Sequence, residues 1–307
     1  MSVYIKYSLI ILSAFLFSCD DLISVDVEEK DPLVVIDAFI DNTSNEQKIT
    51  VARSQPYFDE TRIIGIEDAT VEVLYGSPAN TVVFNHAGEG VYTIPAGFGS
   101  VGDSFELRVT VDGETYHSFS SMNPVPPVDS VTFRYDEFDL FGENEIFYVG
   151  AFWAKDLEGE GNTYWIKSYK NGEFQNKLDM INLAYDAGFS AGSEVDGLNF
   201  IVPIRENVND YDGEDDEFVS PFEDGDSLYV EIHAINPEVF DFLTLAVSNT
   251  NLPSGFGALF ASPLSNTYGN ISPVDPNSEE VVLGCFSVSA VSAGGKRLNV
   301  DEVPKEE

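Results

Sequence analysis

Cysteine, histidine and basic residues are scarce in this chain, and each scarcity excludes a class of function. The 307 residues include two cysteines, three histidines and 15 lysines and arginines, against 53 aspartates and glutamates. The formal net charge of −38 repels phosphate backbones, so we expect no nucleic-acid partner. His86, His117 and His233 have no metal-ligand spacing, and we interpret them as structural or surface residues. The sequence therefore predicts neither a bound metal nor a cofactor.

A short apolar segment precedes the first cysteine. It covers residues 7–17, with Lys6 as the one charged side chain before it, and ends in Leu16-Phe17-Ser18-Cys19. A run of about 11 residues is too short to cross a bilayer, which takes about 20 in a helix, but it matches the apolar part of a signal peptide. We interpret residues 1–18 as a lipoprotein signal peptide, with cleavage before Cys19 and lipidation of its thiol. The alternatives are a plain secretory signal with an incidental cysteine, or a short anchor.

Lipidation of Cys19 has a consequence for the second cysteine. Cys285 is left without a disulfide partner, and no thiolate metal site is possible. Because it lies in an apolar run, residues 281–286, we interpret Cys285 as a buried and inert thiol.

From residue 32 onward, short segments that alternate apolar and polar residues predict strands. Residues 48–54, 69–75 and 104–111 are examples, and Asp112-Gly113 is typical of a two-residue hairpin turn. We predict an all-β protein with two β-sandwich domains. Residues 19–31 would be a tether, 32–123 an Ig- or transthyretin-like sandwich, 128–293 a larger sandwich with one short helix, and 294–307 a loose tail. The proline-rich stretch 123–127 marks the boundary between the domains.

One motif invites a catalytic interpretation. Gly188-Phe189-Ser190-Ala191-Gly192 matches the nucleophile elbow of serine hydrolases, and Asp224 and His233 follow it in the order that this fold uses. The elbow needs a strand-to-helix turn, however, and the residues after Gly192 are poor helix formers. A serine hydrolase that uses Ser190 is therefore a remote alternative, and we predict that the protein is not an enzyme.

Two further groups of residues are candidate binding sites. The acidic run 209–217 could bind Ca²⁺ through hard oxygen ligands, but its spacing fails as an EF-hand loop, which favours a solvated loop. Trp153 and Trp165 could form a platform for a sugar, or fill a sandwich core. A carbohydrate-binding surface module is therefore an alternative function. The candidate calcium ligands are Asp210, Asp212, Asp215 and Asp216.

The order of several motifs along the chain resembles a known family. The motifs are the segment that ends at Cys19, then Arg53-Ser54-Gln55-Pro56-Tyr57-Phe58, Gly90-Val91-Tyr92 and a closing Gly284-Cys285-Phe286-Ser287. Over residues 19–292 the chain resembles a Bacteroidota lipoprotein family catalogued as domain of unknown function 4249. The resemblance implies an outer-membrane lipoprotein, often encoded beside TonB-dependent receptors, and it carries over no catalytic residue. Asp20-Asp21 partly matches the acidic export signal of similar proteins, which favours the cell-surface face over the periplasmic one.

Together these observations predict a non-catalytic lipoprotein, anchored to the outer membrane through Cys19. We expect it to bind a ligand or partner as an accessory of a TonB-dependent receptor.

Overall fold

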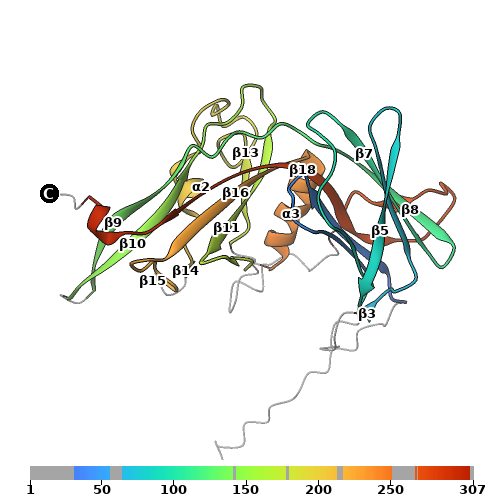
Figure 1. The fold of residues 1–307 in the computed structure, drawn as a ribbon, viewed down its shortest axis with the longest axis horizontal. Helices are drawn as coiled ribbons and strands as arrows, with labels where there is room; N and C mark the ends of the chain where they lie inside the picture. Colours follow the sequence, from blue (N-terminus) through green and yellow to red (C-terminus); the bar gives the residue numbers. More distant parts are fainter. Residues whose placement is uncertain are drawn as a thin grey trace, which may run out of the picture. The chain divides into compact units, whose positions relative to one another are not determined.

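The computed structural model describes residues 31–55, 64–140, 143–177, 180–212, 217–250, 267 and 269–304. Apart from Asp31, the described residues belong to one structural unit, Pro32–Gln55 and Thr61–Glu307. The predicted signal peptide and Cys19 lie outside the described residues. Strands dominate the described chain, which confirms the predicted all-β class (Figure 1).

The first half of the chain forms two strand layers around one core. Strand β5 pairs with β4 through its first residues and with β6 through its last, so it carries the sheet from one layer to the other. Both layers contribute to a single apolar cluster, which includes Ile36, Val73, Tyr92 and Leu107. The predicted turn at Asp112-Gly113 joins β7 to β8, and both of its residues have positive φ, as this hairpin requires. The strands are β1 (Val34–Asp41), β2 (Gln47–Arg53), β3 (Ile64–Gly65), β4 (Thr70–Tyr75), β5 (Asn80–Gly88), β6 (Val91–Ile94), β7 (Ser104–Val111) and β8 (Glu114–Ser121).

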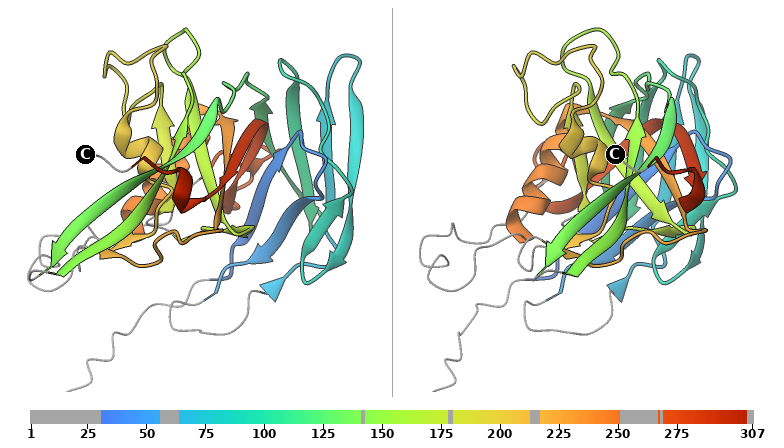
Figure 2. Two further views of the ribbon diagram at one scale, coloured as in Figure 1. Left: turned by 60° about the vertical axis from the view of Figure 1, so that its left-hand side comes forward. Right: turned by 90° about the vertical axis from the view of Figure 1, so that its left-hand side faces the viewer.

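The second half has its own apolar cluster, which includes Phe152, Tyr164, Phe200 and Ile232. Strands β9 and β10 pair only with each other as a ladder and form a separate two-stranded layer beside β18 (Figure 2). The elements are β9 (Ser130–Leu140), β10 (Glu143–Trp153), β11 (Thr163–Lys170), β12 (Glu173–Phe174), β13 (Asn182–Tyr185), α2 (Val202–Glu206), β14 (Tyr211–Asp212), β15 (Glu217–Phe218), β16 (Ser227–Ile235), α3 (Pro237–Thr250), β17 (Ser272–Pro273), β18 (Val282–Arg297) and the 3₁₀ helix η3 (Val300–Glu302).

Strand β18 joins the two halves into one sheet. Residues 282–289 pair in parallel with β1, and residues 290–297 pair antiparallel with β16 on the other edge. Phe286 and Val288 complete the first core, so that core is closed by a strand from the far end of the chain. The strand order is β12-β11-β16-β18-β1-β2-β6-β5-β4-β7-β8-β17, with β13 on β11 and β3 on β2.

The end of β18 differs from the expectation of a loose tail from Gly294. The strand continues to Arg297 because residues 294–297 pair with the start of β16, and η3 follows it. Glycine suits this position because a side chain at Gly294 would meet Val128 at 2.8 Å. Pairing with β16 and the close packing of Gly294 against the Val128 side chain, which sequence composition does not reveal, hold the segment in the sheet.

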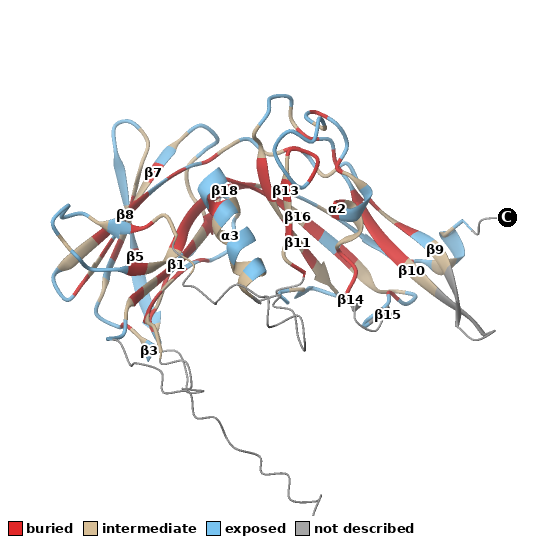
Figure 3. Cartoon of the chain, turned by 180° about the vertical axis from the view of Figure 1, so that it is seen from behind, coloured by how far each residue is buried: buried red, intermediate tan, exposed pale blue. Residues whose placement is uncertain are grey.

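Helix α3 follows β16 and lies in the part of the chain for which the sequence predicts a helix. Its first turn is formed where the Asn236 carbonyl accepts hydrogen bonds from the amides of Val239 and Phe240, and Pro237 occupies the first helical position. Its apolar side contacts β11 and β18, and its other side is exposed (Figure 3). None of the helices in the described residues is long and apolar enough to span a membrane.

Candidate functional site

The face of the sheet that α3 partly covers carries an unusual set of polar side chains. In β1, Ile36 and Ala38 point into the first core, so Asp37 and Phe39 point to the opposite face. In β18, Phe286 and Val288 belong to the first core, so Cys285 and Ser287 share the face of Asp37. Strands β11 and β16 bring Trp165, Lys167, Tyr169, Glu231 and His233 to the same face.

This face is concave. The rings of Phe39 on β1 and Trp165 on β11 lie 5.5 Å apart between centroids, edge to face. Strands β16 and β18 separate β1 from β11, and three strand spacings amount to about 14 Å on a flat sheet. The sheet must therefore bend toward α3 for the two rings to meet. We call the surface formed by Asp37, Phe39, Trp165, Lys167 and Ser287 the concave face.

A compact hydrogen-bonded cluster lies at its β16 side. His233 Nε2 lies 3.1 Å from Glu231 Oε2, and the Tyr169 hydroxyl donates a hydrogen bond of 3.0 Å to the same oxygen. Burial opposes ionisation of Glu231, but the contacts with His233 and Tyr169 outweigh it and hold its pKa below the ordinary value. Burial and the positive charge of Lys167 lower the pKa of His233. The native cluster is thus a carboxylate that accepts hydrogen bonds from Tyr169 and a neutral imidazole.

Lys167 lies next to this cluster but outside its hydrogen bonds. Its Nζ is 4.1 Å from the centroid of the Trp165 ring, a cation–π contact. Burial lowers the pKa of Lys167, and the negative charges of Glu231, Asp41 and Asp37 oppose that effect. Part of the Asp37 side chain is exposed, but the surrounding protein desolvates its carboxyl group and so raises its pKa, and the positive charge of Lys167 only partly offsets this.

A second cluster is the group in the described residues that could hold a metal ion. One carboxylate oxygen from each of Asp156, Asp186 and Asp196 lies within 4.8 Å of the others. Each carboxylate also fastens a loop. Asp156 accepts from the Tyr164 hydroxyl at 2.6 Å, Asp186 from the amides of Gly161 and Asn162, and Asp196 from that of Gly159. These hydrogen bonds indicate that the three carboxylates stabilise the loops around them.

The two tryptophans that could form a sugar platform or fill a core are both in contact with other side chains. Trp153 is 38% exposed, but the guanidinium of Arg205 lies 3.8 Å from its ring centroid, and its Nε1 donates to Thr132. Trp165 is half-buried between Lys167 and Phe39. These contacts occupy part of the surface of each ring.

The acidic run is divided between described and undescribed residues. Asp210 is buried and forms an ion pair with Lys177, with 2.6 Å between Oδ2 and Nζ. Tyr211 and Asp212 form strand β14, which pairs with β15. Asp215 and Asp216 lie outside the described residues. Asp210, the one candidate ligand whose side chain is described, is thus already neutralised by a lysine.

The Ser190 motif does not have the local structure of a nucleophile elbow. Residues 189–198 contain mainly turns and bends, Asn199 forms an isolated bridge with Lys155, and the next helix, α2, begins only at Val202. The histidine that the motif would use, His233, is instead in contact with Glu231.

Cys285 confirms the prediction of an inert thiol. Its side chain is fully buried beneath α3, and burial raises the pKa of the thiol to about 12. The thiolate that would be needed for reaction or metal binding is therefore negligible at neutral pH.

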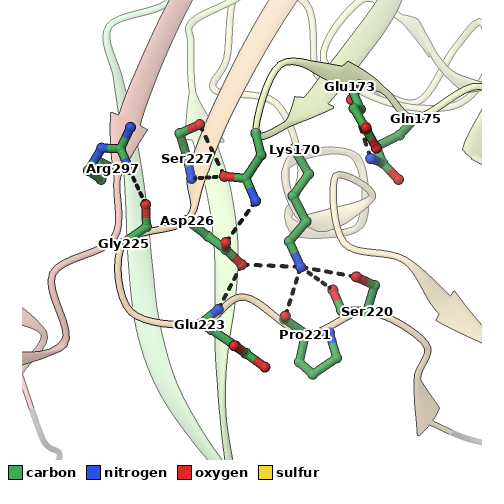
Figure 4. A network of polar contacts seen from close by, with 11 residues as sticks. Lys170, Glu173, Gln175, Ser220, Pro221, Glu223, Gly225, Asp226, Ser227 and Arg297 are labelled. Carbon is green, nitrogen blue, oxygen red and sulfur yellow. Dashed lines mark hydrogen bonds and ion pairs between the residues drawn. The ribbon is translucent and has the colours of Figure 1, made fainter.

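A further polar network surrounds Lys170 at the C-terminal end of β11 (Figure 4). Lys170 Nζ donates to the carbonyl of Pro221 at 2.9 Å and pairs with Asp226 at 3.2 Å. Asn171 donates to the other oxygen of Asp226, at 2.7 Å. The network ties the turn after β11 to the loop before β16, and its charges are mutually satisfied, so it supports the sheet rather than forming a binding site.

Sequence reasoning missed the concave face. It treated His233 as one of three scattered histidines and gave Lys167, Glu231 and Asp37 no role. The one available signal was that each of these residues interrupts an otherwise apolar or aromatic strand, at positions that share a face.

The fold and site define an all-β, strongly acidic protein with a concave polar face. The chain belongs to the family described as domain of unknown function (DUF4249), which matches residues 20–294. No curated protein and no solved structure matches it.

Proposed function

We propose that this protein is an outer-membrane lipoprotein that serves as a non-catalytic accessory, binding a ligand or partner beside a TonB-dependent receptor. The observation that carries the proposal is the segment 7–19, an apolar run that ends in Leu16-Phe17-Ser18-Cys19. An acyl chain adds about 0.8 kcal/mol of membrane affinity for each buried CH₂, so several chains on Cys19 give a stable anchor. Asp20-Asp21 favours the cell-surface face.

The body of the protein supports a binding role over a catalytic one. The Ser190 segment lacks the strand-to-helix turn, and Cys285 is a buried thiol. The charge of −38 keeps the body apart from anionic headgroups, so contact with the membrane depends on the lipid. A sugar platform on Trp153 is not favoured because Arg205 covers that ring.

The anchor is tested by mass spectrometry of the mature protein isolated from membranes. We expect the chain to begin at Cys19 and to carry the mass of its acyl chains. Cys285→Ala is the matched control, because it removes the other cysteine and should leave processing and membrane association unchanged. A mature chain that begins elsewhere, or that carries no lipid, would contradict the anchor.

The partner is tested by affinity purification of the lipidated protein from gently solubilised membranes. Peptides of a TonB-dependent receptor should be enriched relative to a purification of an unrelated lipoprotein. A monomer that carries no receptor under these conditions argues against the accessory role while leaving the anchor intact.

A further inference from the structure

A pocket of about 490 Å³ opens between the start of β1 and the hairpin that joins β7 to β8. Arg53 on β2 connects the two sides of this pocket, because its guanidinium donates a hydrogen bond of 2.5 Å to Asp112 in the hairpin turn. Glu280 lines the pocket from the segment before β18. The volume falls within the range of small-molecule sites, roughly 300–1,000 Å³.

Carboxylates dominate the charge of this pocket. It is lined by Asp112, Glu114 and Glu280, against the single guanidinium of Arg53. Arg53 is already paired with Asp112, whereas Glu114 and Glu280 form no ion pair with a described residue. The pocket should therefore repel an anion and attract a cation.

A tyrosine hydroxyl in the same pocket lacks a partner. Tyr116 is 3% exposed, and its ring belongs to the first core. Its hydroxyl makes no hydrogen bond with a described residue, yet the oxygen is still accessible, and the side chain lines the pocket. Burial, and then the charges of Glu280 and Glu114, raise the pKa of Tyr116, so the hydroxyl stays protonated at neutral pH. The polar end of an otherwise buried side chain is thus available to a ligand.

The spacing of the acidic side chains suits an organic cation better than a chelated metal ion. A chelated ion needs several carboxylate oxygens close together, and the three acids of this pocket do not bring one oxygen each within 4.8 Å of the others. An ammonium group donates three hydrogen bonds in different directions, so it can use acceptors that lie apart. Pro32, Leu33 and Val111 provide apolar walls for the carbon atoms of such a ligand.

We propose that this pocket binds a small organic cation, whose ammonium group is held by Glu114, Glu280 and the Tyr116 hydroxyl. The hydroxyl can accept a hydrogen bond from the ammonium group and donate its own proton to a carboxylate. The proposal names a ligand class for the binding role proposed above and rests on it.

Calorimetric titration of the mature lipidated protein in a non-ionic detergent tests the proposal. Putrescine and spermidine are the probes, and calcium chloride and sodium succinate are the comparators. The buffer contains NaCl at about 0.15 M, where the Debye length is about 8 Å, so that attraction by the net charge of the whole protein is screened. We expect at least one amine to bind saturably with a dissociation constant of about 1 mM or below, and succinate not to bind.

Substitutions of the acidic side chains locate the binding. Glu114→Gln and Glu280→Gln should each weaken amine binding about 10-fold or more, because each removes a charge-assisted hydrogen bond. Glu279→Gln is the matched control. It makes the same change at an exposed position that does not line the pocket, and it should leave binding unchanged.

Tyr116→Phe separates binding from folding, because it removes only the hydroxyl. This hydroxyl bonds to no described residue, so the midpoint of urea unfolding of the free protein should not change. Amine binding should weaken about 5-fold, the effect of one lost hydrogen bond. Urea unfolding also verifies that the two glutamine variants of the pocket are folded.

Two results would overturn the proposal. One is that neither amine binds, or that only calcium or succinate does. The other is that the amines bind equally to the wild type, Glu114→Gln and Glu280→Gln, which would mean diffuse attraction to an acidic surface. Either result leaves the lipid anchor and the receptor association to be judged by their own experiments.

Discussion

At the scale of single residues, the contact between His233 and Glu231 gives the native state a defined response to acid. Burial and Lys167 lower the pKa of His233 from its ordinary value of 6.5. Just below pH 6.5 the unfolded chain therefore binds more protons than the native chain, so stability falls as the pH drops. The contribution of His233 is complete above pH 6.5 and is lost progressively below it.

His233→Gln tests this response. Glutamine keeps an N–H donor for Glu231 but does not titrate, so the loss of stability below pH 6.5 should shrink. The slope that disappears is at most about 1.4 kcal/mol per pH unit, the value for one proton. Urea unfolding at pH 7.5, 6.5 and 5.5 measures it, with His86→Gln on an exposed part of β5 as the control. Equal pH profiles for wild type and His233→Gln would contradict the assignment.

Individual residues also show where prediction from sequence stops. The burial of Cys285 was predictable because apolar neighbours on both sides place it inside a strand. The contact of Lys167 with the Trp165 ring was not, because it depends on which strands become neighbours and on how far the sheet bends. Local sequence carries neither quantity.

At the scale of elements, strands with strict alternation were predictable almost to the residue. Strand β7 covers the predicted residues 104–111, and the bounds of β2 and β4 lie within one residue of the predicted 48–54 and 69–75. Strand β18 runs past residue 293, where the sequence predicts that the second domain ends. Its second part contains Gly294 and Gly295, which disfavour strands locally, and cross-strand pairing with β16 overrides that preference.

The most constrained position of β18 is Gly284. Its φ is +102°, and a side chain there would meet the carbonyl oxygen of Ile36 at 1.9 Å, so β1 and β18 could not keep their pairing. Gly284→Ala should therefore lower the free energy of unfolding by about 3 kcal/mol or more, a size that marks severe backbone conflict.

Gly102→Ala is the matched control for Gly284→Ala. Gly102 also has a positive φ, of +95°, but a side chain there meets nothing within 4 Å. Its substitution should cost only about 1–2 kcal/mol, the backbone penalty alone. Urea unfolding of both variants isolates the contribution of the contact between strands. Equal losses at the two glycines would show that this contact does not limit stability.

At the scale of the whole molecule, the sequence predicts the all-β fold class but not which strands pair with one another. Composition and period-two patterns indicated an all-β protein, and the proline-rich stretch 123–127 does separate β8 from β9. The parallel pairing of β1 with β18 joins residues that are about 250 positions apart, and no local pattern encodes that contact. The concave face depends on this pairing, which is why the site emerged only with the fold.

The net charge of −38 also acts on the whole molecule. Ion pairs such as Arg53–Asp112 and Arg134–Glu206 are exposed and involve few of the 53 acidic side chains, so repulsion among the remaining acids should destabilise the folded state. Added salt screens this repulsion more than it weakens the few attractions. Raising NaCl from 20 mM to about 0.2 M should raise the midpoint of thermal unfolding by about 2–4 °C, because the Debye length falls to below 10 Å.

The midpoint of unfolding should change little when NaCl is raised further. Sucrose at equal osmolality leaves charges unscreened, so it should not reproduce the steep rise at low NaCl. A midpoint that falls with NaCl, or that rises linearly to 1 M, would mean that specific ion pairs or solvent exclusion, and not acidic repulsion, set the stability of this protein.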